Sequence, residues 1–339
     1  MTNSHIISKM TDSTEPPLPQ PLPTAVMVII FHLLYLGLPL GFTLGPIYLL
    51  FQKGWWCPRV VGSAWIGTYL LWFSLTRHSE TDGKGRPWPA FENLRLFRRI
   101  FQWFPLRLVA TKSLPSTHQQ EQYIFGVHPH GTLAFGRALF GWATKDLWDQ
   151  SFPGIDFRVL TATAAFRVPI IREMWLWSYC IDASKPVAVR ALQEGTSLLL
   201  YPGGIKEQLM TERGKHTVYL KNRKGFIKLA LQHGCTLVPI YIFGESDLYH
   251  HWSIALGFRQ WIANHWSAAI MILSGSLGLL PYRVPITGVS GPPITVKQIE
   301  HPSQKEIDDL HDTYVKALVD LFDSQKATYG YKNAMLEIL

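Results

Sequence analysis

The sequence predicts an α/β domain with a mainly parallel, mixed sheet flanked by helices, preceded by a pair of apolar helices. Short apolar runs alternate with helical stretches over most of the chain, as they do where helices connect the strands of a parallel sheet. Nearer the N-terminus, a long stretch without charged side chains is followed by a second apolar run. Hydrophobic residues make up 47% of the 339 residues and charged residues only 17%, which is an apolar composition for a soluble protein.

The N-terminal region predicts a disordered tail followed by a membrane-embedded helical hairpin. Residues 1–23 are polar and then rich in proline, which indicates the tail. Residues 25–51 carry no charged side chain, and one crossing of a bilayer needs roughly 20 apolar residues. The second run, residues 60–75, is somewhat shorter. We expect residues 24–76 to cross the membrane twice or to dip into one leaflet. The alternative is an unusually apolar helix pair in a soluble protein.

Glycine spacing and charge suggest how this hairpin packs and which way it faces. Gly37, Gly41 and Gly45 repeat a GxxxG spacing, which either lets helices approach closely or only adds flexibility near two prolines. Basic residues gather after the hairpin more than in its link, and positive charge favours the cytosolic side. They are Arg77, Lys84, Arg86, Arg95, Arg98 and Arg99 after the hairpin, against Lys53 and Arg59 in the link. Both termini are therefore expected in the cytosol, with residues 77–339 as a cytosol-facing domain.

The strands and helices of this domain are predicted from apolar runs and helical periodicity. Four buried strands are expected at residues 122–127, 157–161, 197–201 and 236–243, with a helix over residues 221–233. A last helix follows Ser303 and Glu306, whose spacing is that of a capping box. Its apolar side chains recur at helical intervals at Ile307, Leu310, Tyr314, Leu318 and Leu321.

Charge, cysteine count and missing motifs narrow the class of function. The formal net charge of +8 suits nucleic acid, an acidic membrane surface or a phosphate-bearing ligand. No nucleic-acid motif accompanies it, so nucleic acid is the least favoured partner. The three cysteines lie far apart, which predicts neither a disulfide framework nor a cysteine zinc site. The absence of GxSxG, GxxxxGK[ST] and GxGxxG motifs disfavours a standard lipase, a nucleotide-driven enzyme and a dehydrogenase.

Two histidines follow the first strand of the domain, in the run His128-Pro129-His130-Gly131. Reactive side chains in α/β sheets often stand just past the carboxyl end of a strand, and histidine is the commonest general base. These histidines are either catalytic or part of a stiff turn in which they bond only to the backbone. A metal is disfavoured, because no HExxH motif and no nearby cysteine supplies further ligands.

A second motif combines Pro202, Gly203 and Gly204 with Glu207. Glycines let main-chain N–H groups approach a developing oxyanion, and a carboxylate can orient an imidazole. The alternative is an ordinary strand-to-helix turn with an exposed carboxylate. A third motif places four cations at the start of the predicted helix 221–233, against the preference of the helix dipole. This cluster is either a phosphate site for coenzyme A or a solvated basic face.

Four blocks in order resemble the type-2 diacylglycerol acyltransferase family, which also includes monoacylglycerol and wax-alcohol acyltransferases. They are Tyr123–Gly126 with His128–Gly131, Gly203-Gly204 with Glu207, Arg223–Phe226, and Val238–Glu245. The resemblance runs from about Leu71 to the C-terminus. It implies a glycerolipid-acyltransferase-like fold and residence in the endoplasmic reticulum membrane, with lipid droplets as a second location.

The resemblance also implies the reaction and the roles of the site residues. Acyl-CoA would be the co-substrate, with no separate cofactor, and a neutral lipid the acceptor, at a membrane; a homo-oligomer is left open. His130 would be the base and Glu207 its partner, with His128 either catalytic or holding the turn. Arg223 and Lys224 would face the acyl donor. The remaining substrate-binding residues would be Phe125, Gly126, Pro129, Gly131, Phe166, Arg167, Pro202, Gly203, Gly204, Gly225, Phe226, Gly244 and Glu245.

Two departures from related patterns bear on these expectations. Phosphate-lipid acyltransferases of the wider fold carry HxxxxD, but Leu133 and Phe135 stand five residues after the two histidines. Ile205 and Lys206 replace the small residues of the commoner animal form, which bears on the choice of acceptor. Diacylglycerol is the expected acceptor; monoacylglycerol and long-chain alcohol are alternatives. A hydrolase, a non-catalytic lipid-binding protein and a phospholipid-type acyltransferase are less favoured.

Overall fold

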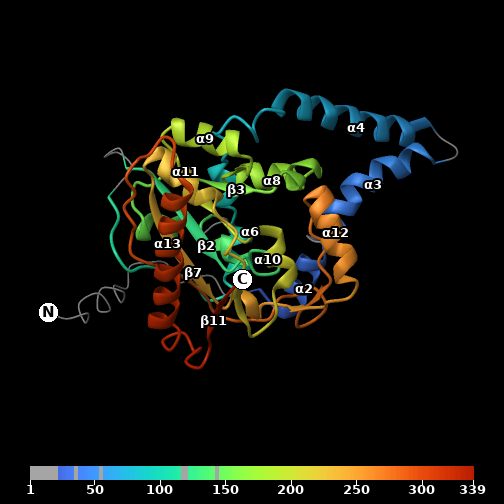
Figure 1. Cartoon of the computed structure of the whole chain (residues 1–339). Helices are drawn as coiled ribbons and strands as arrows, with labels where there is room; N and C mark the ends of the chain where they lie inside the picture. The colour runs from blue at the N-terminus through green and yellow to red at the C-terminus, as the bar shows by residue number, and fades with distance from the viewer. Residues whose placement is uncertain (1–21, 34–36, 53–55, 116–120, 142–144) are drawn as a thin grey trace, which may run out of the picture.

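The computed structural model describes residues 22–33, 37–52, 56–115, 121–141 and 145–339. Its centre is a seven-stranded sheet in the order β1-β10-β7-β2-β5-β3-β4. Strands β2, β3 and β7 of this sheet are labelled in Figure 1. Every pair of neighbouring strands is parallel except β10 and β7. The strands are β1 (Leu106–Ala110), β2 (Tyr123–His128), β3 (Phe157–Thr161), β4 (Cys180–Asp182), β5 (Ser197–Leu200), β7 (Thr236–Phe243) and β10 (Ile286–Ser290). The predicted α/β class and mainly parallel sheet are confirmed.

Helices cover both faces of the sheet, so the domain has three layers and two apolar cores. One core lies under α9 (Lys185–Gln193), α11 (Gly225–His233) and α13 (Gln304–Gln325). The other lies under α6 (Arg95–Phe101), α7 (Lys145–Ser151), the 3-10 helix η4 (Phe135–Leu139) and α8 (Ile171–Trp177). The other elements are α5 (Pro89–Glu92), η5 (Thr163–Arg167), α10 (Gly204–Met210), β6 (His216–Val218), η6 (Glu245–Asp247), β8 (His250–His251), α12 (Leu256–Trp266), β9 (Leu273–Ser274) and β11 (Leu336–Ile338).

Strand β2 is buried along its whole length between β7 and β5. An apolar run without alternation suits such a position, because both faces of a parallel sheet are covered. Strands β3 and β7 have the predicted bounds. Helix α13 begins with the predicted capping box, in which the Ser303 hydroxyl accepts from Glu306 N–H and the Glu306 carboxylate accepts from Ser303 N–H.

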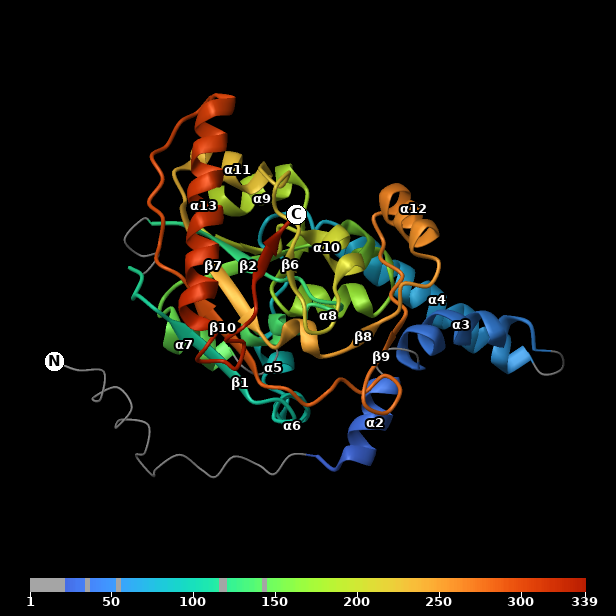
Figure 2. The ribbon, with the colours of Figure 1, turned by 60° about the horizontal axis from the view of Figure 1, so that its bottom comes forward.

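The predicted N-terminal hairpin corresponds to three helices, α2 (Thr24–His32), α3 (Leu38–Leu50) and α4 (Trp56–Thr76). Helices α3 and α4 pack together as an arm that projects from the domain (Figures 1 and 2). Helix α2 instead inserts Met27 and Phe31 into the apolar core of the domain. The apolar run 25–51 therefore serves two purposes, since α2 is part of the folded core and only α3 belongs to the arm.

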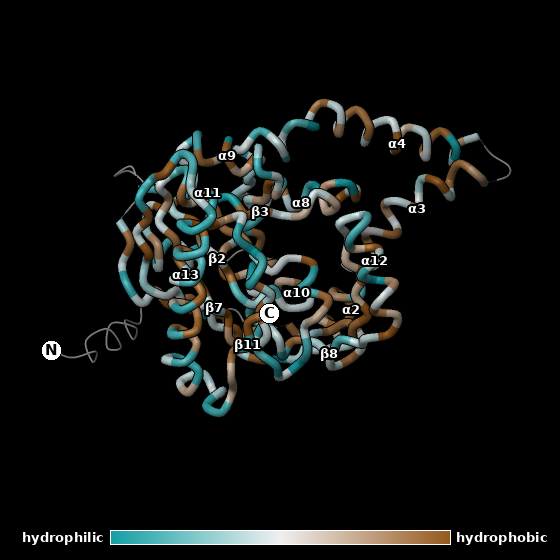
Figure 3. The backbone as a smooth tube through the Cα atoms, in the orientation of Figure 1, coloured by the Kyte–Doolittle hydropathy of each residue, from teal (hydrophilic) through white to brown (hydrophobic). Residues whose placement is uncertain are grey.

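Apolar residues recur along the arm in the hydropathy view (Figure 3). Within the described part of the chain, no helix is both long enough and apolar enough to cross a membrane. The predicted embedding of the arm in a membrane therefore stays a prediction. The predicted disordered tail falls mostly on residues 1–21, which lie outside the described residues.

The two helices of the arm meet at Gly62, not at the predicted GxxxG glycines. A Cβ atom at Gly62 would lie 2.7 Å from the Pro46 carbonyl oxygen of α3. Gly41 and Gly45 have no atom within 4 Å of the position that a Cβ would take. Gly41 and Gly45 thus make no close contact with α4, and a Cβ at Gly37 would meet the Leu33 side chain rather than α4.

Candidate active site

The carboxyl end of β2 delivers His130 to the wall of a cavity of about 700 Å³. The cavity lies where β3 and β5 also end, and α10 and α12 close it. Besides His130, its polar wall residues are Arg137, Thr161, Thr163, Ser184, Tyr201, Lys206, Gln208, Arg223, Asn264 and Ser267. Carboxyl ends of neighbouring parallel strands share one edge of a sheet, which is why residues distant in sequence meet here.

The hydrogen bonds of His130 define which ring nitrogen can accept a proton. Its Nδ1 lies 3.2 Å from the Gly131 carbonyl oxygen, which can only accept, so Nδ1 carries the hydrogen. In the neutral ring Nε2 is then the unprotonated nitrogen. Burial lowers the pKa of His130 below its ordinary value, although its bond to Gly131 acts in the opposite direction. The side chain is thus neutral and able to act as a base near neutral pH.

Unlike His130, His128 is fully buried and lies outside the wall of the cavity. Its Nε2 lies 3.0 Å from the hydroxyl of Tyr314 on α13, and that hydroxyl donates to the Gly126 carbonyl. Burial lowers the pKa of His128 to about 3. His128 does not line the cavity, so its position fits the holding of the turn rather than proton transfer. A Cβ at Gly126 would overlap the Tyr314 hydroxyl, which explains the glycine there.

Glu207 lies directly behind His130 but bonds to its main chain. One carboxylate oxygen accepts the His130 backbone N–H and the other accepts the Tyr219 backbone N–H at 2.7 Å. Burial raises the pKa of Glu207 to about 7, although these bonds and the charge of Arg223 lower it. Each carboxylate oxygen of Glu207 thus accepts a hydrogen bond from a backbone N–H group. The structure does not show the expected bond to the imidazole; Glu207 fixes the loop that carries it.

The glycine pair makes room for this carboxylate. A Cβ at Gly203 would overlap the Glu207 carboxylate. Gly204 adopts a φ of 57°, in the left-handed region that favours glycine, and its N–H donates to the Tyr201 carbonyl. Because that N–H is already bonded, it is not free for the predicted role at an oxyanion. Pro202 and Gly204 line the cavity, whereas Gly203 is buried behind it.

Glu245 holds the next part of the same loop. Its two oxygens accept the backbone N–H groups of Phe135 and Gly136, at 2.9 and 2.5 Å. Burial raises the pKa of Glu245 to about 8 despite these bonds. A Cβ at Gly131 would overlap this carboxylate. Glu245 therefore supports the loop that follows His130, and none of Glu245, Gly131 and Gly244 lines the cavity.

The predicted basic cluster borders a second, smaller cavity of about 460 Å³. Arg223, Tyr201 and Pro202 line both cavities, so the two adjoin. Lys185, Lys224 and Gly225 line the smaller one, which gives it a cationic rim. Lys224 is paired with Asp308 at 2.7 Å, and Arg223 donates to the Gly203 carbonyl at 3.0 Å. The cationic rim thus lies beside the cavity of His130.

Several predicted substrate-binding residues lie in the core or on the surface instead. The ring of Phe125 packs on Trp148, and Phe166 is buried in the same core. Pro129 is buried beside the turn, joined to His128 by a cis peptide bond. Arg167 is exposed. Phe226 borders the smaller cavity and packs edge-on against Tyr314. The cavity lies at the carboxyl ends of the strands, so side chains such as Phe125 that point into the core from the face of the sheet do not reach it.

Sequence reasoning missed part of the cavity wall. Tyr201 contributes a buried hydroxyl without a hydrogen-bond partner among the described residues. Arg137 stacks on Trp175 at 4.2 Å, and both line the cavity. Helix α12 adds Ala263 and Asn264. Tyr201 stands directly before the glycine motif, so its position at a strand end was the available signal. No local sequence pattern identifies the other wall residues, which are Arg137, Trp175, Ala263 and Asn264.

Among the residues that the structure describes, no group of three or more His, Cys, Asp or Glu side chains is arranged to hold a metal ion.

The sequence of this chain is similar to a family model and to several named acyltransferases. The family model described as "Diacylglycerol acyltransferase" matches residues 49–339. Diacylglycerol O-acyltransferase 2 of Mus musculus is 36% identical over 278 residues, 77% of this chain and 70% of that protein. Acyl-CoA wax alcohol acyltransferase 1 of Homo sapiens is 34% identical, covering 84% and 87%. For 2-acylglycerol O-acyltransferase 1 of Bos taurus the identity is 33%, covering 77% and 81%.

Among solved structures, the chain is similar to the 1-acyl-sn-glycerophosphate acyltransferase PlsC of Thermotoga maritima. The TM-score is 0.42 and the identity 12%, over 88% of this chain and 95% of that one.

Proposed function

Because the chain belongs to the diacylglycerol acyltransferase family, we propose that it moves a fatty acyl group from coenzyme A to the free hydroxyl of diacylglycerol, forming triacylglycerol. The observation that carries this proposal is His130, which lines the larger cavity with Nδ1 bonded to a carbonyl and Nε2 left as a base. The adjoining cationic cavity supports an acyl-CoA donor, because its phosphates need positive charge.

The proposed reaction is a direct transfer at His130. Nε2 takes the proton of the acceptor hydroxyl while the oxygen attacks the thioester carbonyl carbon. The tetrahedral intermediate then expels the coenzyme A thiolate, which leaves readily and takes up a proton from the imidazolium. Glu207 acts by holding the His130 main chain in place. The proposed reaction uses acyl-CoA as its second substrate and no separate cofactor or metal.

The acceptor has two further candidates. The named relatives include a wax alcohol acyltransferase and a 2-acylglycerol acyltransferase at nearly the same identity as the diacylglycerol enzyme. A long-chain alcohol and monoacylglycerol are therefore the alternatives to diacylglycerol. All three are neutral lipids with a free hydroxyl, so the proposed chemistry at His130 is the same.

We further propose that the α3–α4 arm rests in the endoplasmic reticulum membrane, with both termini cytosolic, and that the protein also reaches lipid droplets. The support is the apolar surface that the arm and α12 expose. Its large side chains include Leu44, Tyr48, Trp56, Leu71, Leu75, Phe258 and Trp266. Such a surface would keep the catalytic cavity close to its apolar substrates.

The proposal is tested in membranes that lack neutral-lipid synthesis, with labelled long-chain acyl-CoA. Diacylglycerol, monoacylglycerol, long-chain alcohol and lysophosphatidate are supplied separately. We expect label in triacylglycerol, and a loss of about 10²–10⁴-fold in His130→Ala, the usual contribution of a general base. His301→Ala, an exposed histidine, is the matched control.

The outcomes separate the hypotheses. Label only in wax ester would retain the mechanism and replace the acceptor. Release of free fatty acid without an acceptor would indicate a hydrolase. Full activity in a well-expressed His130→Ala protein would refute the role of His130.

A further inference from the structure

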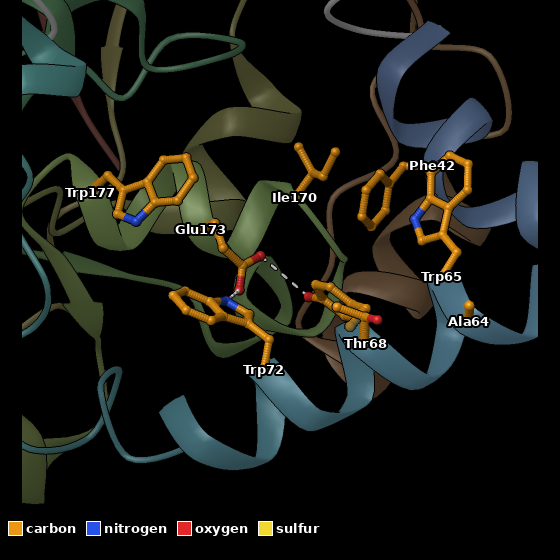
Figure 4. Close-up of a pocket in the computed structure, with 9 residues that line it drawn as sticks. Phe42, Ala64, Trp65, Thr68, Trp72, Ile170, Glu173 and Trp177 are labelled. Carbon is orange, nitrogen blue, oxygen red and sulfur yellow. Dashed lines mark hydrogen bonds between the residues drawn. The ribbon is translucent and has the colours of Figure 1, made fainter. Parts of the chain in front are cut away.

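A second large cleft lies between the arm and the α/β domain, away from His130. Its volume is about 700 Å³, within the range of small-molecule sites. Helices α3 and α4 form one wall with Phe42, Ala64, Trp65, Thr68, Tyr69 and Trp72. The other wall is α8 with its preceding residue, through Ile170, Glu173 and Trp177. Figure 4 shows these side chains facing one another across the cleft.

One carboxylate stands in this otherwise apolar cleft. Glu173 is 6% exposed, and one of its oxygens accepts from Arg172 at 2.8 Å and from the Trp72 indole N–H at 3.3 Å. Among the residues that the structure describes, the other oxygen accepts from the Tyr69 hydroxyl alone, at 3.3 Å. A carboxylate oxygen has two lone pairs. Glu173 can therefore accept one more hydrogen bond from a molecule in the cleft.

The charges behind the cleft select against an anionic guest. Arg172 is fully buried and contacts both Glu173 and Glu80, at 2.8 and 2.6 Å. This cluster of one cation and two carboxylates carries a formal charge of −1, while the Arg86 guanidinium lies outside it, over the Trp72 ring at 4.7 Å. A fatty-acid carboxylate or a phosphate would be repelled, whereas a hydroxyl can donate to Glu173. Aromatic and aliphatic walls suit a long hydrocarbon chain.

The cleft and the catalytic cavity lie on opposite sides of α8. Trp175 lines the cavity of His130, while Glu173 and Trp177, two residues to either side, line the cleft. At the lip of the cleft, Ile170 has a φ of 66°, an unusual conformation for a β-branched residue. Backbone strain of this kind tends to occur where a ligand site demands it.

We propose that this cleft binds a neutral long-chain lipid through its free hydroxyl, which donates to Glu173. The inference rests on the proposed function, because such a lipid is the acceptor class for the reaction. It adds a holding site for the acceptor one helix away from the catalytic cavity, on the side of the apolar arm. The acyl donor does not fit this site, because its phosphates would face the negative cluster.

The test uses hexadecanol with a diazirine on its chain and, for comparison, hexadecanoic acid with the same group. Both are photolysed on the full chain carrying His130→Ala, and the labelled peptides are mapped by mass spectrometry. We expect the alcohol to label residues 64–72 and 170–177, and the acid to label them about tenfold less. Because no turnover occurs, labelling reports on the cleft even if the transfer assay fails.

Matched variants assign the label to the cleft. Ala64→Trp fills it and is expected to reduce labelling about tenfold. Leu71→Trp, on an exposed position of α4 outside the cleft, is expected to leave labelling unchanged. Glu173→Gln should narrow the difference between alcohol and acid. Competition by unlabelled alcohol against unlabelled acid in the unsubstituted protein tests the same preference without any change to the fold.

Equal labelling by the two probes would overturn the proposal. Label confined to peptides around His130 would do so too, as would equal labelling of Ala64→Trp and Leu71→Trp.

Discussion

Single buried residues hold the loop that carries His130. Glu207 and Glu245 each use both oxygens on backbone N–H groups, and Tyr314 bonds to His128 from the opposite side. His130, the proposed base, is thus positioned through its main chain, by residues more than seventy positions away in sequence. Such supports decide geometry without touching a substrate.

At Glu245 the support has a consequence for stability. Its pKa is raised to about 8 in the folded protein by burial, above the ordinary value of 4.5. The folded state therefore binds more protons than the unfolded state between these values, and stability falls as the pH rises through about 8. We expect thermal unfolding of the solubilised protein at a lower temperature at about pH 9 than at about pH 7, where histidines are already neutral when unfolded.

Glu245→Gln isolates this effect. The variant cannot ionise at this position, so we expect a weaker dependence on pH, even though its stability is lower at about pH 7. An unchanged slope in the variant would assign the pH dependence to other groups.

Tyr314 supplies the second prediction at this scale. Tyr314→Phe removes the hydroxyl that bonds Nε2 of His128 and leaves that buried nitrogen without its partner. The expected loss is about 1–3 kcal/mol in the free energy of unfolding, with reduced turnover. Tyr48→Phe, an exposed tyrosine on α3, is the control. Equal stability of the two variants, measured by chemical unfolding, would show that the Tyr314 hydroxyl supports nothing.

Among the elements, the arm depends on one close approach. Gly62 of α4 has backbone of α3 within 2.7 Å of the position of a Cβ, whereas Gly67 of the same helix has open space. Gly62→Val should push α3 away and raise its amide hydrogen exchange, while Gly67→Val should leave exchange in α3 unchanged. Both substitutions place the same β-branched side chain in the same helix. A similar response in both would mean that helix propensity, not packing, governs the arm.

At the scale of the whole molecule, Arg172 joins the arm to the α/β domain. It is buried and bonds Glu173, Glu80 and the Thr76 carbonyl, at the end of α4. Arg172→Met leaves two carboxylates without their cation, so we expect a loss of about 3–5 kcal/mol in the free energy of unfolding.

The matched change is Lys145→Met, which breaks a partly exposed ion pair with Asp149 and should cost at most about 1 kcal/mol. Chemical unfolding of both variants gives the comparison. A small loss in Arg172→Met would mean that contacts other than those of Arg172 hold the arm to the domain.

Local signals in the sequence were sufficient for part of the fold and of the site. The bounds of β3 and β7, the capping box of α13 and the position of His130 past a strand end all follow from patterns within about ten residues. Four motifs in order were enough for the family, which the comparisons confirm. These features depend on neighbours along the chain, so they can be read without knowing its path.

The tertiary structure alone decided the roles that depend on distant partners. Glu207 bonds to the main chain of His130, since the turn presents its N–H and not its ring. The apolar run 25–51 divides because α2 packs into the core of the domain, whereas α3 packs against α4. The cleft at Glu173 exists because α4 and α8 face each other in space, although about a hundred residues separate them in the sequence. The periodicity of apolar residues in the sequence indicates which face of a segment is apolar. Which surface covers that face depends on how the whole chain packs.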